Sequence, residues 1–161
     1  MSHLESTYGL NRFVLVGWSF GGAPVFTTAG QDSRVVGCAT IASQTAETSS
    51  IRKLSPRPVL LMHGTADQTL GASCSESLFE RYGGERGVDG RGKGRLVLFE
   101  GDNHSLQGNA VEAERLLLGF IVEMAGVEID EGVVREKLVK DQERVKLMEQ
   151  GGDLDGKERL E

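Results

Sequence analysis

Four short runs rich in hydrophobic residues divide the first hundred positions of the chain, at 13–16, 35–42, 58–62 and 95–99. Apolar, β-branched runs of this length, without polar alternation, are typical of strands that are covered on both faces in a parallel sheet. Helical patterns are expected at 20–29, 46–54, 74–82 and 107–124. Alternation of strands and helices predicts a four-stranded parallel α/β sheet with its strands in chain order and helices on its faces.

The pattern changes after residue 124. Residues 1–124 form the predicted α/β unit, 125–150 are predicted to be a charged amphipathic helical extension, and 151–161 a disordered tail. The extension has one narrow apolar seam, formed by Val134, Leu138, Val145 and Met148. Docking of this helix on the sheet is favoured over pairing with a partner helix, because two heptads fall short of a coiled coil.

Composition narrows the classes of partner. The formal net charge is −6 and the pI about 5.2, which disfavours binding to nucleic acid or to anionic membranes. The basic segment 83–95 is so rich in glycine that it is interpreted as a mobile connector. The polar N-terminus lacks the apolar segment of a signal peptide, which favours a cytoplasmic location. Two cysteines and three dispersed histidines predict neither a disulfide framework nor a metal site, and no cofactor is expected.

A G-x-S-x-G motif, GWSFG, occupies residues 17–21 at the junction between the first strand and the first helix. In this position the motif is typical of a nucleophile elbow, where the serine lies in a strained turn and flanking glycines let the backbone pack closely. Ser19 is the candidate nucleophile. The competing interpretation is a glycine-rich turn with an incidental serine.

A serine hydroxyl needs a general base and an acid that orients the base, and both follow later strands. Asp67 lies in HGTAD, after the third strand, and His104 lies in EGDNH, after the fourth. The order serine, aspartate, histidine, each just beyond a strand, is the order found in α/β-hydrolases and differs from the orders of the two serine protease families.

The three motifs GWSFGG, HGTADQTL and FEGDNHSL resemble the nucleophile elbow, acid loop and histidine loop of α/β-hydrolases, in particular small dienelactone-hydrolase-like and serine-esterase members. The resemblance implies Ser19 as nucleophile, His104 as general base and then acid, Asp67 as its orienting partner, and the Phe20 backbone N–H in the oxyanion hole. Serine in place of the cysteine of dienelactone hydrolases implies carboxylic esters as substrates.

Other residues compete for these roles. Asp102 lies two positions before His104 and is the alternative acid, although it lacks the context of the HGTAD loop. His63 is interpreted as a packed histidine rather than a base. Cys38 and Cys74 are expected to be structural thiols. Two further side chains are given structural roles: Trp18 is expected to pack beneath the elbow or line the pocket, and Glu47 to be a solvated helix residue.

The resemblance covers only the C-terminal half of the hydrolase fold, because few residues precede the elbow and HLESTYGLNR resembles the end of the preceding helix. One oxyanion donor would then be missing, at a cost on the order of 10²–10³ in rate. The predicted function is a serine ester hydrolase with an open site and a small-molecule ester substrate. The alternative is a catalytically impaired fragment with an interaction or structural role. An exposed edge of the 13–16 strand further predicts self-association.

Overall fold

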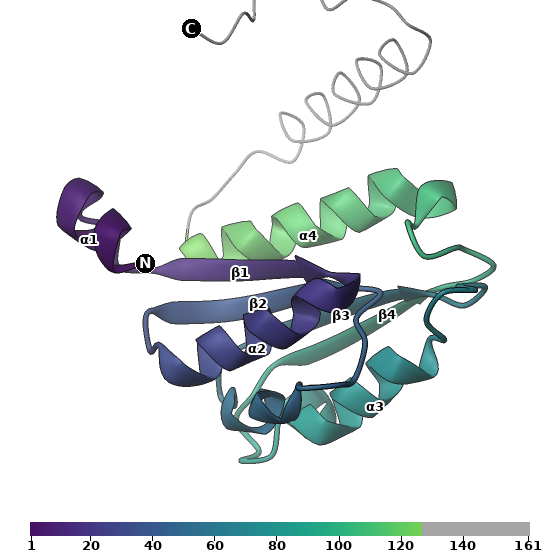
Figure 1. The fold of residues 1–161 in the computed structure, drawn as a ribbon, viewed down its shortest axis with the longest axis horizontal. Coiled ribbons are helices and arrows are strands. Elements are labelled where there is room, and N and C mark those ends of the chain that lie inside the picture. The colour runs from purple at the N-terminus through teal and green to yellow at the C-terminus, as the bar shows by residue number, and fades with distance from the viewer. Residues whose placement is uncertain (127–161) are drawn as a thin grey trace, which may run out of the picture.

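The computed structural model describes residues 1–126, which form a four-stranded sheet covered by helices on both faces (Figure 1). The strands are β1 (Phe13–Trp18), β2 (Val35–Ile41), β3 (Val59–Gly64) and β4 (Gly94–Phe99). All neighbouring pairs are parallel, and the strand order is β1-β2-β3-β4, which confirms the predicted topology. Apart from its first two residues, the extension predicted at 125–150 lies outside the described residues, as does the predicted tail.

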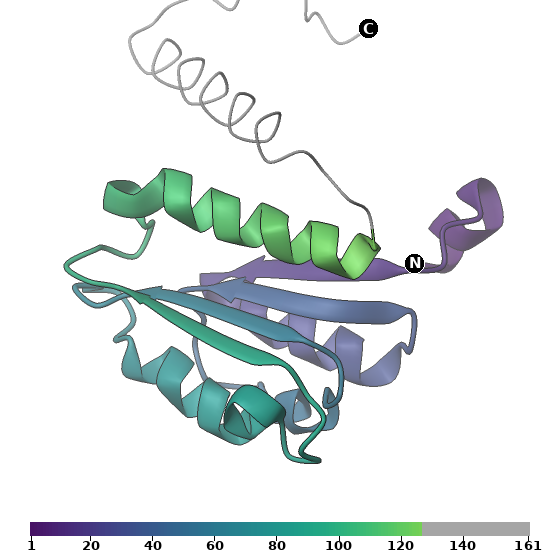
Figure 2. The same cartoon turned by 180° about the vertical axis from the view of Figure 1, so that it is seen from behind.

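Helices α2 (Gly22–Gln31) and α3 (Ser73–Tyr82) cover one face of the sheet, and α4 (Ala110–Ala125) covers the other, as the two opposite views show (Figures 1 and 2). The first face buries Phe26, Leu61 and Tyr82 in one apolar cluster. The second buries Leu60, Met62 and Phe120 in another. Helix α1 (Ser2–Tyr8) lies beside the amino end of β1.

Two elements differ from the sequence prediction. The expected helix at 46–54 is only the 3-10 turn η2 (Ser49–Lys53), because side chains in this segment bond to the backbone instead. The Thr48 hydroxyl donates to the Thr45 carbonyl, at 2.6 Å. Glu47, expected on a helix, is an exposed turn residue with a φ of 55°. Strand β1 is only half-buried, and Val16 is 43% exposed, because β1 lies at the edge of the sheet.

The strand-to-helix turn after β1 is packed closely at two of its glycines. A Cβ on Gly17 would lie 2.5 Å from the carbonyl oxygen of Gly21. A Cβ on Gly22 would lie 1.9 Å from the hydroxyl oxygen of Ser43. A Cβ on Gly21 would meet no atom within 4 Å. Close packing therefore explains the first glycine of G-x-S-x-G and the glycine after the motif, but not the second glycine of the motif itself.

No helix within residues 1–126 combines the length and the hydrophobicity that a membrane span requires.

We predict that Gly17→Ala lowers the free energy of unfolding by about 1–3 kcal/mol, because the new methyl group collides with backbone that cannot move aside. Gly21→Ala is the matched control and should change the free energy of unfolding by less than about 0.5 kcal/mol. Urea titration followed by circular dichroism gives both values. Equal stability of the two variants would contradict the packing described here.

Self-association through β1 stays a prediction. Because β1 lies at the edge of the sheet, a substitution on its exposed surface can test this prediction. Pairing across a two-fold axis would satisfy the outer backbone groups of β1. We expect a dimer by light scattering after size exclusion at tens of micromolar, and Val16→Lys should shift it to monomer. Val111→Lys, at a comparably exposed valine on α4, should leave it a dimer. A wild-type monomer that unfolds cooperatively would contradict the prediction.

Candidate active site

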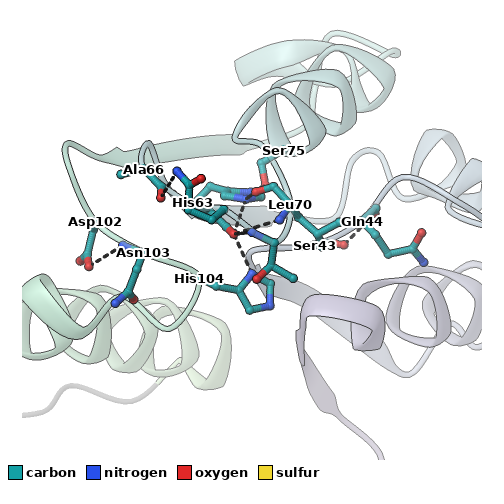
Figure 3. A network of polar contacts seen from close by, with 12 residues as sticks. Ser43, Gln44, His63, Ala66, Leu70, Ser75, Asp102, Asn103 and His104 are labelled. Atoms are coloured by element: carbon teal, nitrogen blue, oxygen red, sulfur yellow. Dashed lines mark hydrogen bonds and ion pairs between the residues drawn. The ribbon is translucent and has the colours of Figure 1, made fainter.

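The three predicted site residues lie at the same edge of the sheet. Ser19 follows β1, Asp67 follows β3 and His104 follows β4. In a parallel sheet the carboxyl ends of all strands meet at one edge, so the topology alone places these three residues along that edge. Ser43 and Gln44, which follow β2, lie beside the same network (Figure 3).

Ser19 occupies the strained turn that the motif predicts. Its φ is 53°, in the left-handed region that residues other than glycine rarely adopt, and such a conformation costs on the order of 1–3 kcal/mol. The 3-10 turn η1 (Ser19–Gly21) then leads directly into α2. The backbone N–H of Gln44 donates to the Ser19 carbonyl at 3.4 Å, which ties the turn to the segment after β2.

The acid loop and the histidine loop are joined through their backbones. A Cβ on Gly64 would lie 2.3 Å from the carbonyl oxygen of Asp102, so only glycine allows this approach. The N–H of Ala66 donates to that same carbonyl at 2.9 Å. The N–H of Gly101 donates to the Thr65 hydroxyl at 2.8 Å. The glycine of the HG-x-x-D pattern thus allows the loops after β3 and β4 to pack directly against each other.

Asp67 is hydrogen-bonded to His104 across these two loops. Nδ1 of His104 lies 2.6 Å from Oδ2 of Asp67, whose side chain is fully buried (Figure 3). Oδ1 of Asp67 accepts from the N–H groups of Thr69 and Leu70, at 2.7 and 2.9 Å. Burial would raise the pKa of the Asp67 carboxyl. The hydrogen bonds from Leu70, His104 and Thr69 outweigh burial and hold that pKa below its ordinary value.

The imidazole of His104 therefore has the orientation that a general base needs. Because the carboxylate of Asp67 can only accept, Nδ1 carries the proton and Nε2 is left as the acceptor. In Figure 3 a dashed line reaches one nitrogen of the His104 ring and none reaches the other. The His104 side chain is 20% exposed, so a substrate can reach the ring.

Trp18 connects the elbow to the histidine loop. Its indole N–H donates to the backbone carbonyl of His104 at 3.2 Å, and the two rings lie 5.8 Å apart between centroids. The side chain is 53% exposed, so it lies over the site rather than beneath the elbow. Within residues 1–126, the Ser19 hydroxyl forms no hydrogen bond with His104. Such bonds often form only with substrate bound.

The competing candidates have other roles. Among the described residues, Asp102 forms no hydrogen bond with the imidazole of His104. Its carboxylate accepts from the N–H groups of Asn103, Gly108 and Asn109 and from the Asn109 amide, which shapes the loop before α4. Burial raises the pKa of the Cys38 thiol to about 12, so this core cysteine is unreactive at neutral pH. Cys74 is a half-buried residue of α3.

His63 is the site residue whose contacts the sequence interpretation missed. It is fully buried, as a packed histidine should be, but its Nε2 lies 3.1 Å from Oδ2 of Asp67. The sequence shows the spacing of four residues between His63, on β3, and Asp67, in the loop after it, but this spacing does not distinguish a packed histidine from one that donates to the acid. Among the described residues, no three His, Cys, Asp or Glu side chains are grouped as ligands of a metal ion.

The chain is similar to known proteins in structure but not in sequence. No protein-family model matches the sequence, and no curated protein matches it. Est1E from Butyrivibrio proteoclasticus is similar in structure, with a TM-score of 0.63 and 14% identity over 78% of this chain and 66% of that one. A monoacylglycerol lipase from Paleococcus ferrophilus has a TM-score of 0.59 and 16% identity, over 76% of this chain and 72% of that one. The esterase domain of a Rhodothermus marinus protein has a TM-score of 0.52 and 22% identity, over 66% of this chain and 56% of that one.

The matched region spans between 56% and 72% of the length of these three structures. At these identities the likeness concerns the arrangement of the backbone. The four-stranded parallel sheet flanked by helices agrees with that arrangement. The described residues have part of the α/β-hydrolase fold, four parallel strands flanked by helices, as the sequence predicts.

Proposed function

We propose that this protein is a serine hydrolase that cleaves carboxylic esters through an acyl-enzyme. The observation that carries the proposal is the hydrogen bond of 2.6 Å between His104 and the buried carboxylate of Asp67, at the sheet edge where Ser19 occupies a strained turn. A structural histidine has no need of a partly exposed ring whose second nitrogen, among the described residues, has no hydrogen bond. A general base does.

The reaction assigns one role to each group. Nε2 of His104 accepts the Ser19 proton while the serine oxygen attacks the ester carbonyl carbon, and the Phe20 N–H stabilises the resulting oxyanion. The imidazolium then donates its proton to the leaving alcohol, which leaves the acyl group on Ser19. Water, deprotonated by His104, attacks that acyl group, and the proton returns from His104 to Ser19 as the acid leaves. Asp67 holds the Nδ1–H and stabilises the imidazolium.

The surroundings of Ser19 favour small or accessible esters. Trp18 and Phe20, the two neighbours of the serine, are 53% and 77% exposed, so the candidate nucleophile lies among open apolar surface. The stretches between the three site residues are too short to hold a cap domain. We also propose that the protein belongs to the dienelactone-hydrolase-like or serine-esterase group and that it is cytoplasmic.

We predict that a fluorophosphonate probe labels Ser19, because the reagent reacts with a serine that its base has activated. Ser19→Ala should abolish labelling and reduce turnover of p-nitrophenyl acetate by about 10³-fold or more. Intact-mass spectrometry and absorbance measure the two effects.

Failure of folded wild-type protein to react with the probe would overturn the proposal. It would favour the alternative, a catalytically impaired fragment that serves as an interaction or structural module. That alternative draws its support from the partial coverage of the esterase and lipase structures.

The two buried carboxylates give a second prediction. Asp67→Asn should reduce kcat by a factor on the order of 10⁴, because the amide favours the wrong tautomer of His104. Asp102→Asn should reduce the free energy of unfolding, since its oxygens accept four hydrogen bonds, while kcat falls far less. Steady-state kinetics and urea titration on both variants measure the difference. The opposite pattern would assign Asp102 as the orienting acid.

A further inference from the structure

A second imidazole contacts the carboxylate that orients His104, and the reaction proposed above does not use it. His63 is the fifth residue of β3 and has no exposed surface. Its Nε2 lies 2.9 Å from the carbonyl oxygen of Leu70 and 3.1 Å from Oδ2 of Asp67. Its Nδ1 lies 2.7 Å from the hydroxyl of Ser75, on α3 (Figure 3).

These partners determine which nitrogen of His63 carries the proton. The Leu70 carbonyl and the Asp67 carboxylate can only accept, so Nε2 must be the donor. A neutral ring then presents a lone pair at Nδ1, and the Ser75 hydroxyl, which can donate or accept, donates to it. Every polar atom of the ring is thereby paired without a buried positive charge.

Asp67 consequently has four donors for the four acceptor positions of a carboxylate. Thr69 and Leu70 fill Oδ1 from the backbone, and His104 and His63 share Oδ2. Among the described residues, His63 and His104 are the titratable side chains hydrogen-bonded to this carboxylate. Two imidazoles on one oxygen divide its negative charge, so each hydrogen bond is weaker than it would be alone.

We propose that His63 is a positioning residue that acts through Asp67. As a neutral Nε2–H donor, it fixes the rotation of the carboxylate and limits how strongly that carboxylate stabilises the imidazolium of His104. Ser75 supports this role, because donation to Nδ1 polarises the ring and strengthens the Nε2–H donor. The assignment rests on the proposed function, in which His104 must give up its proton in each cycle.

The first test needs no activity. Imidazole ¹⁵N spectra of the wild-type protein, labelled at histidine, report the tautomer of each ring. We expect the His63 ring to carry its proton on Nε2 and a lone pair on Nδ1, as its hydrogen-bond partners require. A proton on Nδ1, or a doubly protonated ring at pH 7, would overturn the proposal.

The second test follows the titration of His104 in the same spectra, again without turnover. His63→Leu removes the donor and keeps the volume apolar, and the midpoint of the His104 titration should rise by about half a pH unit or more. His63→Gln, whose amide nitrogen can occupy the place of Nε2, should keep the midpoint close to that of wild type. An unchanged or lower midpoint in His63→Leu would assign His63 a packing role only.

Ser75→Ala keeps the test decisive should His63→Leu fail to fold. Loss of the hydroxyl should raise the His104 midpoint in the same direction by a smaller amount. Ser77→Ala, on the same helix outside the contacts of His63, should leave the midpoint unchanged. Identical midpoints in Ser75→Ala and wild type would overturn the supporting role of Ser75 and the polarisation on which it depends.

Activity provides the third readout and separates the two proposals. In His63→Leu, the acid limb of the profile of kcat/KM against pH should move to higher pH. A loss of alignment at Asp67 would instead lower kcat and move the limb to lower pH. A wild-type protein that the fluorophosphonate probe does not label would refute the serine hydrolase. The tautomer and titration results would still decide how His63 acts on Asp67 and His104.

Discussion

The burial of the Asp67 carboxylate is the constraint on which the rest of the site depends. An ionised group without exposed side-chain surface is tolerated only when donors surround it, and its donors come from two separate loops and the end of β3. The loop after β3 must turn back to supply two backbone N–H groups. The loop after β4 must supply an imidazole. Because Gly64 lets the carbonyl of Asp102 approach within a distance that a side chain would forbid, both loops can satisfy that requirement at once.

The carboxylate of Asp102 also needs hydrogen-bond donors, but it takes them from a single segment of the chain. It is also buried, and burial would raise the pKa of its carboxyl, but hydrogen bonds from Asn109, Gly108 and Asn103 outweigh burial and hold that pKa low. All these donors belong to the segment that carries His104 into α4. The Asp67 carboxylate therefore binds the imidazole of His104, and the Asp102 carboxylate shapes the loop that carries His104. Because both pKa values are lowered in the folded protein, protonation of either carboxylate as the pH falls below the ordinary carboxyl range removes stability that is present at neutral pH.

The strands and their order were predictable because buried parallel strands leave continuous apolar runs, and the edge that holds the site follows from parallel topology alone. The pairing of Asp67 with His104 was predictable from the HGTAD context. The helix predicted at 46–54 was wrong, because serine and threonine side chains in this segment compete for the backbone hydrogen bonds that a helix needs. The contacts of His63 were missed for another reason. A buried histidine and a histidine that donates to a buried acid look alike in sequence, and the difference lies in the distance from Nε2 to one carboxylate oxygen.

The proposed reaction requires Ser19 to come close to His104, although the strands that these residues follow, β1 and β4, are at opposite edges of the sheet. Asp67 and His104 are hydrogen-bonded to each other across the loops after two neighbouring strands, whereas Ser19 follows an edge strand that is paired on one side only. Two contacts join its turn to the rest of the site: the Trp18 indole N–H on the His104 carbonyl and the Gln44 N–H on the Ser19 carbonyl. Loosening of β1 would therefore separate the serine from the imidazole and leave the bond between Asp67 and His104 intact. In the proposed reaction, the stability of that edge strand therefore decides whether Ser19 is available to His104.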